Sequence, residues 1–98
     1  MNYRNKKILG LANEIEKCTG CGKFADGTIT AAHSNQLIDG KGTGIKAHDY
    51  RVAYLCSKCH YELDQGKTLD KSSRRAMWEE AHRKTIGWLF ESGHLKVL

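Results

Sequence analysis

The chain of 98 residues contains no proline, few aromatic residues (8%) and no long apolar run. A membrane-spanning helix needs about 20 predominantly apolar residues, so we expect no transmembrane segment and no membrane partner. Residues 1–17 also lack the unbroken apolar stretch and the small-residue cleavage site of a secretory signal. The sequence therefore favours a cytoplasmic protein, in a compartment where paired cysteines are more often metal ligands than disulfides.

A chain of this length is expected to fold as one domain, residues 1–98, around a single small core. Only 40% of the residues are hydrophobic, so burial of apolar surface alone would leave such a domain marginally stable. Small domains of this kind are often held together by a metal ion or by disulfides. The four cysteines of the sequence are available for either purpose.

The charge balance is basic, with 16 Lys and Arg residues against 11 Asp and Glu residues, a net charge of +5 and a pI near 9.1. A basic domain suits a polyanionic partner such as DNA. Small soluble domains that bind no nucleic acid can carry the same charge, so this observation needs support from a site.

Apolar periodicity and glycine positions predict an α+β fold. A short helix is expected from Asn5 to about Glu16, bent near Gly10. Two strands are expected at 28–33 and 50–55, and they are followed by a helix at 57–64. A long helix is expected at about 70–92, started by Asp70 or Ser72 and ended by Gly93, with an apolar face formed by Met77, Trp78, Ala81, Thr85, Trp88 and Leu89.

The cysteines occur as two C-x2-C pairs, Cys18 with Cys21 and Cys56 with Cys59. Two intervening residues allow both sulfurs of a pair to reach one ion at about 2.3 Å, so two pairs predict a tetrahedral zinc site of four thiolates. Such a site has no open coordination position and would be structural. Disulfides, or a redox-active dithiol, are the alternatives.

His60 and Asp64 lie four residues apart on a predicted helix and therefore on the same helix face, as two ligands of one divalent ion would. His33, at the end of the preceding strand, could approach that face if the strands pair and the helix packs across them. Simpler explanations are a hydrogen bond from His60 to the zinc site and an exposed helix-end position for Asp64.

A glycine-rich loop, DGKGTGIK, occupies residues 39–46 and carries Lys41 and Lys46, with Arg51 and Lys58 close by in sequence. Lysines and backbone amides of this kind suit a phosphate backbone. A mobile, solvated loop is the alternative. The basic residues Arg74, Arg75, Arg83 and Lys84 are interleaved with Glu79 and Glu80, so local ion pairs could explain them.

Several of these motifs resemble the HNH, or ββα-metal, nuclease superfamily in its version with a four-cysteine zinc site. The residues that carry the resemblance are CTGCGK (18–23), AHS (32–34), DGKGTGIKAHD (39–49) and LCSKCHYELDQG (55–66). More narrowly, they look like the small phage and prophage nucleases of the YbcO type, which are related to the RecA-dependent nuclease Ref. The resemblance covers about residues 18–66, the expected zinc-stapled ββα core.

The resemblance implies that His33 is the general base that takes a proton from the attacking water. It implies that His60 binds the catalytic metal and that Asp64 is a further metal ligand or an orienting polar residue. On chemical grounds, one Mg²⁺ or Mn²⁺ could be held by His60 with Asp64 or Asp49 and several waters. Many superfamily members have an acidic ligand where this chain has Ala32. The middle residue of the HNH pattern also departs from its usual place: Arg51 is nearest by count, and His48 or Asp49 could substitute.

The leading hypothesis is thus a metal-dependent DNA endonuclease that acts in phage or prophage recombination or DNA processing. Hydrolysis of a phosphodiester needs a positioned water, a base and a cation, and a neutral imidazole suits the base at cellular pH. The alternative is a zinc module without catalysis that binds nucleic acid or a recombination protein. That module would need the cysteines but neither His33 nor a second metal.

Overall fold

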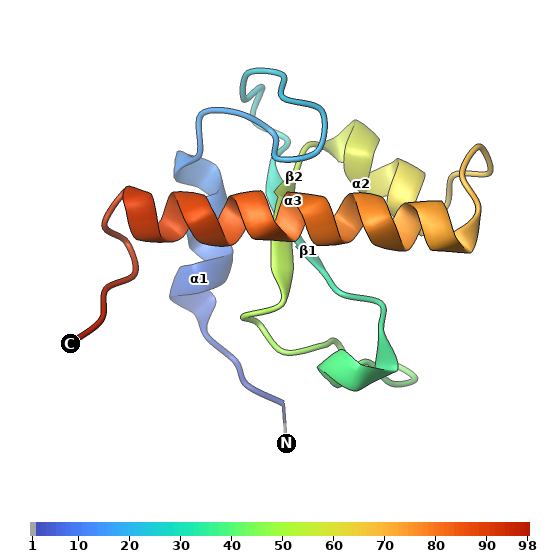
Figure 1. The fold of residues 1–98 in the computed structure, drawn as a ribbon, viewed down its shortest axis with the longest axis horizontal. Coiled ribbons are helices and arrows are strands. Elements are labelled where there is room, and N and C mark those ends of the chain that lie inside the picture. The colour runs from blue at the N-terminus through green and yellow to red at the C-terminus, as the bar shows by residue number, and fades with distance from the viewer. Residues whose placement is uncertain (1) are drawn as a thin grey trace.

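The computed structural model describes residues 2–98 and has an α+β fold (Figure 1). The first helix is followed by two strands, and two further helices complete the chain. The bounds are α1 Lys6–Gly10, β1 Thr30–His33, β2 Val52–Leu55, α2 Ser57–Asp64 and α3 Lys71–Glu91, with 3-10 turns at Leu11–Glu14 and Leu37–Asp39.

The strands β1 and β2 form an antiparallel hairpin whose register pairs His33 with Val52 and Thr30 with Leu55. All four residues of β2 are buried, whereas β1 is only partly buried. Both strands begin two residues later than the sequence predicts. Thr28 lies outside β1 because its N–H and its hydroxyl both donate to Asp26. Arg51 lies outside β2 because its N–H donates to the His48 carbonyl and so closes a turn.

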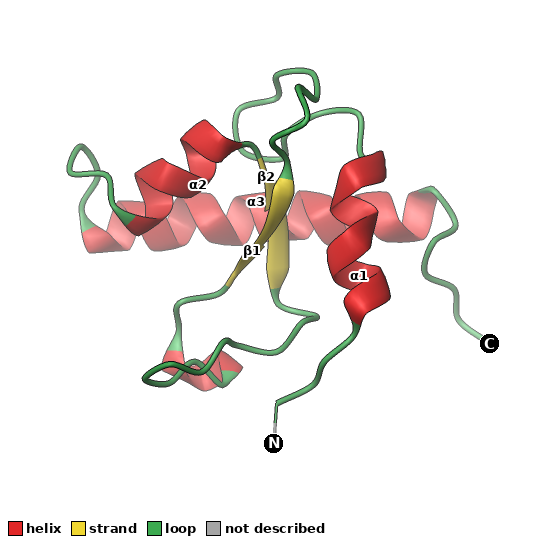
Figure 2. Ribbon diagram, turned by 180° about the vertical axis from the view of Figure 1, so that it is seen from behind, coloured by secondary structure: helices red, strands yellow, loops and turns green. Residues whose placement is uncertain are grey.

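The long helix α3 crosses one face of the hairpin, and α1 and α2 lie on either side of the strands (Figures 1 and 2). It buries Trp78, Ala81, Thr85 and Leu89, while Met77 and Trp88 pack partly buried against the same core. These are the residues of the predicted apolar face. Asp70 starts the helix by accepting a hydrogen bond from the Ser73 N–H, as predicted for one of the two candidate caps.

Thr85 is fully buried and fixes α3 to the outer edge of β2. Its hydroxyl accepts the Tyr54 N–H at 3.0 Å and donates to the Ala81 carbonyl at 2.9 Å. In Thr85→Val the Tyr54 N–H would stay buried without an acceptor, which costs about 1–3 kcal/mol. We expect chemical denaturation to show that loss for Thr85→Val and a much smaller one for Thr85→Ser. Equal stability of the two variants would contradict the role of the hydroxyl.

The N-terminal helix is shorter than predicted, because α1 ends at Gly10 and the chain continues as the 3-10 turn Leu11–Glu14. Gly10, the predicted position of a bend, is the residue at which the α-helix gives way to the 3-10 turn. Asn5 starts α1 by accepting the N–H groups of Lys7 and Ile8, and the Tyr54 hydroxyl donates to the Ile8 carbonyl. The helix α1 is thereby attached to β2, the strand that carries Tyr54. Among residues 2–98, no helix has the length and apolar character that crossing a membrane requires.

Candidate metal centres and catalytic site

The four cysteines converge at one point of the fold. Cys18 and Cys21 lie in the turn before β1, Cys56 follows β2, and Cys59 lies in the first turn of α2. Their sulfur atoms all lie within 4.8 Å of one another, and the Cys21 and Cys56 sulfurs are 3.9 Å apart. Sulfurs that share a tetrahedral zinc ion at about 2.3 Å are separated by about 3.8 Å, whereas a disulfide needs about 2.05 Å. The cluster therefore suits a metal ion such as zinc.

Backbone donors surround the Cys18 sulfur, which accepts the N–H groups of Gly20 and Cys56, each at 3.3 Å. Burial opposes ionisation of Cys18, but these backbone donors outweigh it and lower the pKa of the thiol to about 7. For Cys59, burial and the neighbouring sulfurs raise the pKa. One thiolate is thus favoured by the protein alone, and a bound cation would stabilise the others.

Gly20 is required by the closeness of the cysteine turn to α2. A Cβ at this position would lie 3.0 Å from Leu55 Cδ2 and 3.1 Å from the Cys59 sulfur. A larger residue would therefore push the first cysteine pair away from the second. This close packing keeps both cysteine pairs within reach of one shared ion, as their spacing predicted.

His60 and Asp64 form a pair on α2, with His60 Nε2 lying 3.0 Å from Asp64 Oδ2. Two neighbouring ligands of an octahedral ion at about 2.1 Å are separated by about 3.0 Å. The Thr30 hydroxyl lies 3.4 Å from His60 Nδ1, and Asn35 donates to the other oxygen of Asp64 at 3.4 Å. With these outer contacts made, Nε2 and Oδ2 face each other at the spacing that two ligands of one cation would have.

Within residues 2–98, only the four cysteines form a group of three or more metal-capable side chains in ligand contact. His60 and Asp64 therefore supply two ligands, and water or substrate would complete the shell. Mg²⁺ commonly keeps several waters and binds through one or two protein groups together with phosphate oxygens. The pair fits such an ion.

His33 is held by Asp49, which comes from the loop before β2. His33 Nε2 lies 2.8 Å from Asp49 Oδ1, and the carboxylate is almost fully buried, at 2% exposure. Asp49 faces His33 and not His60, so it does not join the His60–Asp64 pair. Metal ligation beside His60, one of its predicted uses, does not fit this placement.

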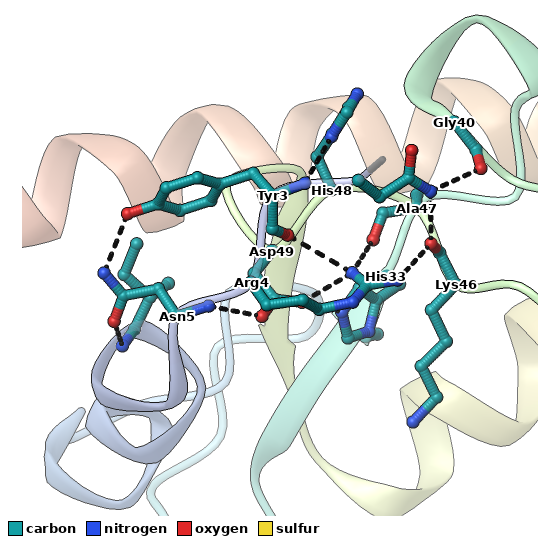
Figure 3. A network of polar contacts seen from close by, with 12 residues as sticks. Tyr3, Arg4, Asn5, His33, Gly40, Lys46, Ala47, His48 and Asp49 are labelled. Atoms are coloured by element: carbon teal, nitrogen blue, oxygen red, sulfur yellow. Dashed lines mark hydrogen bonds and ion pairs between the residues drawn. The ribbon is translucent and has the colours of Figure 1, made fainter.

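The N-terminal segment fixes this carboxylate from behind (Figure 3). Arg4 donates to Asp49 Oδ1 at 3.0 Å, and the Asn5 N–H donates to Oδ2 at 2.7 Å. Burial opposes ionisation of Asp49, but the hydrogen bonds from His33 and Asn5 and the charge of Arg4 outweigh it, so its pKa lies below the usual value. An ionised Asp49 accepts the Nε2 proton of His33, which leaves Nδ1 as the basic nitrogen.

The same segment secures the glycine-rich loop. Asn2 donates to the carbonyls of Gly40 and Lys46 at 2.7 and 2.8 Å, and Arg4 donates to the carbonyls of Lys46 and Ala47. The Lys46 side chain extends away from this network (Figure 3). The loop is thus anchored through its backbone carbonyls, and the Lys41 and Lys46 side chains take no part in that anchoring.

One surface pocket of about 210 Å³ brings the predicted groups together. It is lined by His33, by the pair His60 and Asp64, and by Lys41 and Lys46. The histidine that could act as a base, the pair that could bind a cation and two lysines therefore face one space. This is the arrangement that the sequence predicted from three separate segments.

Arg51, predicted to contact nucleic acid, is placed elsewhere. Its guanidinium lies 2.9 Å from Asp39 and 2.7 Å from Glu79, and it stacks over the Trp78 ring at 4.8 Å. Because two carboxylates neutralise its charge inside the fold, we exclude it from the phosphate-binding residues. Lys58 is exposed on α2 but does not line the pocket.

A second pocket, also of about 210 Å³, adjoins the first and shares His33, Asn35 and Asp64 with it. Lys71, Arg74 and Arg75 of α3 line its outer side. The sequence placed Arg74 and Arg75 on the helix but did not connect them with the site, and it did not single out Lys71, Thr30 or Asn35. Thr30 belonged to the predicted strand and Asn35 to the AHSNQ segment, but no spacing marks either residue as a partner of α2.

The chain was compared with protein-family models, with curated proteins and with solved structures, and none of them matches it. The resemblance to the HNH superfamily therefore rests on the motifs of the sequence alone.

Proposed function

We propose that this protein is a metal-dependent endonuclease that hydrolyses phosphodiester bonds of DNA, with a structural zinc ion at the four cysteines. The observation that carries the proposal is the shared pocket of His33, His60 and Asp64, flanked by Lys41 and Lys46. A base, a cation site and phosphate-binding groups are the three requirements of metal-assisted hydrolysis.

In this proposal His33 Nδ1 takes a proton from the attacking water. Asp49 holds the imidazole in the tautomer that leaves Nδ1 unprotonated, and its charge stabilises the imidazolium that forms. Arg4 and Asn5 keep the Asp49 carboxylate ionised and fixed. The hydrogen bond from His33 to a buried carboxylate is the support for this assignment.

His60 Nε2 and Asp64 Oδ2 would hold Mg²⁺ or Mn²⁺, which stabilises negative charge on the phosphate and the leaving oxygen when bound. Lys41 and Lys46 would contact phosphate oxygens beside the cleaved bond. The four-cysteine zinc would fix the turn before β1 against the start of α2 and take no part in the chemistry. The HNH resemblance supports the same roles for His33 and His60, and it suggests a phage or prophage context with a recombination protein as a further partner.

A nicking assay on supercoiled plasmid tests the proposal. We expect conversion to open circles with added Mg²⁺ or Mn²⁺, and none without added cation, because zinc at the cysteines leaves no open coordination position. In His60→Ala with Asp64→Ala we expect at least a tenfold loss at low Mn²⁺ concentration, since second-row contacts alone change metal binding by 10- to 100-fold. Lys58→Ala is the matched control on α2. Nicking without added cation, or full activity in the double variant, would contradict the metal assignment.

One observation favours the alternative, a zinc module that binds nucleic acid without cleaving it. Among the described residues the cysteine cluster is the only preassembled group of three or more metal ligands. Metal counting by mass spectrometry separates the two functions: the nuclease binds a second cation per chain in the presence of Mn²⁺ and DNA, and the module binds zinc alone.

A further inference from the structure

The second pocket has two chemically different sides. Its buried floor is apolar and formed by Ala32, Leu63 and Trp78, and its more exposed rim is cationic and formed by Lys71, Arg74 and Arg75. The polar residues His33, Asn35, Gln36 and Asp64 complete the lining. The floor comes from β1, α2 and α3, and the rim from the first two turns of α3. The catalytic groups proposed above do not use these residues.

The rim carries more positive than negative charge, with Asp70 and Asp64 as the nearby carboxylates. Within residues 2–98, Lys71, Arg74 and Arg75 form no ion pair, whereas Arg83, farther along α3, pairs with Glu80 at 3.1 Å. Three cations without a direct ion-pair partner at the edge of one pocket attract an anionic ligand. Together with Lys41 and Lys46, they place cations on both sides of His33 and Asp64.

The apolar floor determines which kind of chemical group can be attached to the bound anion. Trp78 is 6% exposed, its N–H donates to the Ala32 carbonyl, and its ring faces are covered by His82 and Arg51. A bare phosphate would lose hydration against this surface without gaining a donor there. A flat apolar group with an attached phosphate satisfies both sides of the pocket, and an unpaired nucleotide is such a group.

A paired base would not reach the floor, because in a duplex the base is stacked between neighbours and its edge is engaged. We propose that this pocket binds one unpaired nucleotide of a DNA single strand, with the base on the apolar floor and the phosphate on Lys71, Arg74 and Arg75. Because the pocket shares His33 and Asp64 with the catalytic pocket, this nucleotide is adjacent to the phosphate that is cleaved. That adjacency rests on the proposed function, and it makes single-stranded or branched DNA the substrate class.

Fluorescence anisotropy with labelled oligonucleotides tests the proposal on the full chain, with zinc retained and no Mg²⁺ or Mn²⁺ added. The probes are a 12-nucleotide thymidylate strand, a blunt duplex of the same length and a 12-unit abasic deoxyribose phosphate strand. We expect the thymidylate strand to bind severalfold more tightly than the abasic strand, because only a base can cover the apolar floor of Ala32, Leu63 and the Trp78 edge. The duplex should bind more weakly than the thymidylate strand.

Substitution of the rim arginines gives a second measurement, the change in single-strand affinity. Arg74→Ala and Arg75→Ala should each weaken single-strand binding about fivefold at 0.1 M salt and reduce the slope of log K against log salt by about 0.7. Arg83→Ala is the matched control, because it removes the same charge from the same helix outside the pocket. Thermal melting verifies that all three variants fold.

Equal affinity for the thymidylate and abasic strands would overturn the nucleotide pocket, as would unchanged binding in both rim variants. The nicking assay gives a separate result. Cation-dependent nicking with unchanged rim variants would overturn this inference and leave the nuclease in place. Selective binding of the thymidylate strand, with no cation-dependent cleavage of plasmid or of single-stranded DNA, would support the pocket and overturn the nuclease.

Discussion

His33→Ala should lower the rate of DNA cleavage by about 10²- to 10⁴-fold, the usual contribution of a positioned general base. The loss is expected in the cleavage step itself, because in the proposed mechanism His33 acts on the water and not on the cation. Single-turnover cleavage of a labelled oligonucleotide at saturating Mn²⁺ measures it directly. Asp49→Asn should cause a loss of similar size, since the amide no longer holds the tautomer with an unprotonated Nδ1 and no longer stabilises the imidazolium.

The matched control for His33→Ala is His48→Gln, in the loop that also carries Asp49. His48 accepts the Tyr3 N–H through Nδ1 and stacks on Tyr50, and it does not line the catalytic pocket. This variant should cleave at nearly the wild-type rate. Equal cleavage by wild type and His33→Ala, with both proteins folded, would refute the assignment of the base.

Cys56→Ser should abolish tight zinc binding and unfold the domain at 25 °C. Structural zinc contributes about 10–16 kcal/mol of apparent binding free energy in zinc-finger peptides, and a whole domain is typically stable by only about 5–15 kcal/mol. Cys56 is fully buried between β2 and α2, so the loss of its thiolate removes the link between the hairpin and the helix. Circular dichroism and zinc content by mass spectrometry measure both effects.

Ser57→Ala is the control for this variant, because Ser57 contacts its neighbours through its backbone N–H and its side chain is exposed. It should keep both zinc and fold. Chelation of the wild-type protein should reproduce the unfolding, and added zinc should reverse it. A metal-free protein with an unchanged melting temperature would show that the cysteines do not stabilise the fold.

Local features of the site followed directly from the sequence. The C-x2-C spacing predicted the cysteine cluster because two intervening residues allow both sulfurs to turn toward one point. The separation of four residues between His60 and Asp64 predicted their contact, since helix geometry alone places them on one face. The bounds of α2 and the buried face of α3 were predicted for the same reason: both depend on short-range periodicity.

The partners of charged side chains were not predictable in this way. Arg51 was expected at the phosphate interface, but it is neutralised by Asp39 and Glu79, which come from a loop and from α3. The contact of Asp49 with His33 and the position of Arg74 beside the site likewise depend on how the loop folds back and where α3 crosses the hairpin. Long-range packing decides these contacts, and no local pattern in the sequence encodes them.

The central claim is that His33 faces a cation held on α2. Anomalous diffraction from crystals soaked in Mn²⁺ tests it directly, because manganese and zinc are distinguished by their absorption edges. The account predicts a manganese ion bound by His60 Nε2 and Asp64 Oδ2, with a bound water within hydrogen-bond reach of His33 Nδ1. Zinc at the four cysteines with no manganese beside His60, in crystals that also contain DNA, would contradict it.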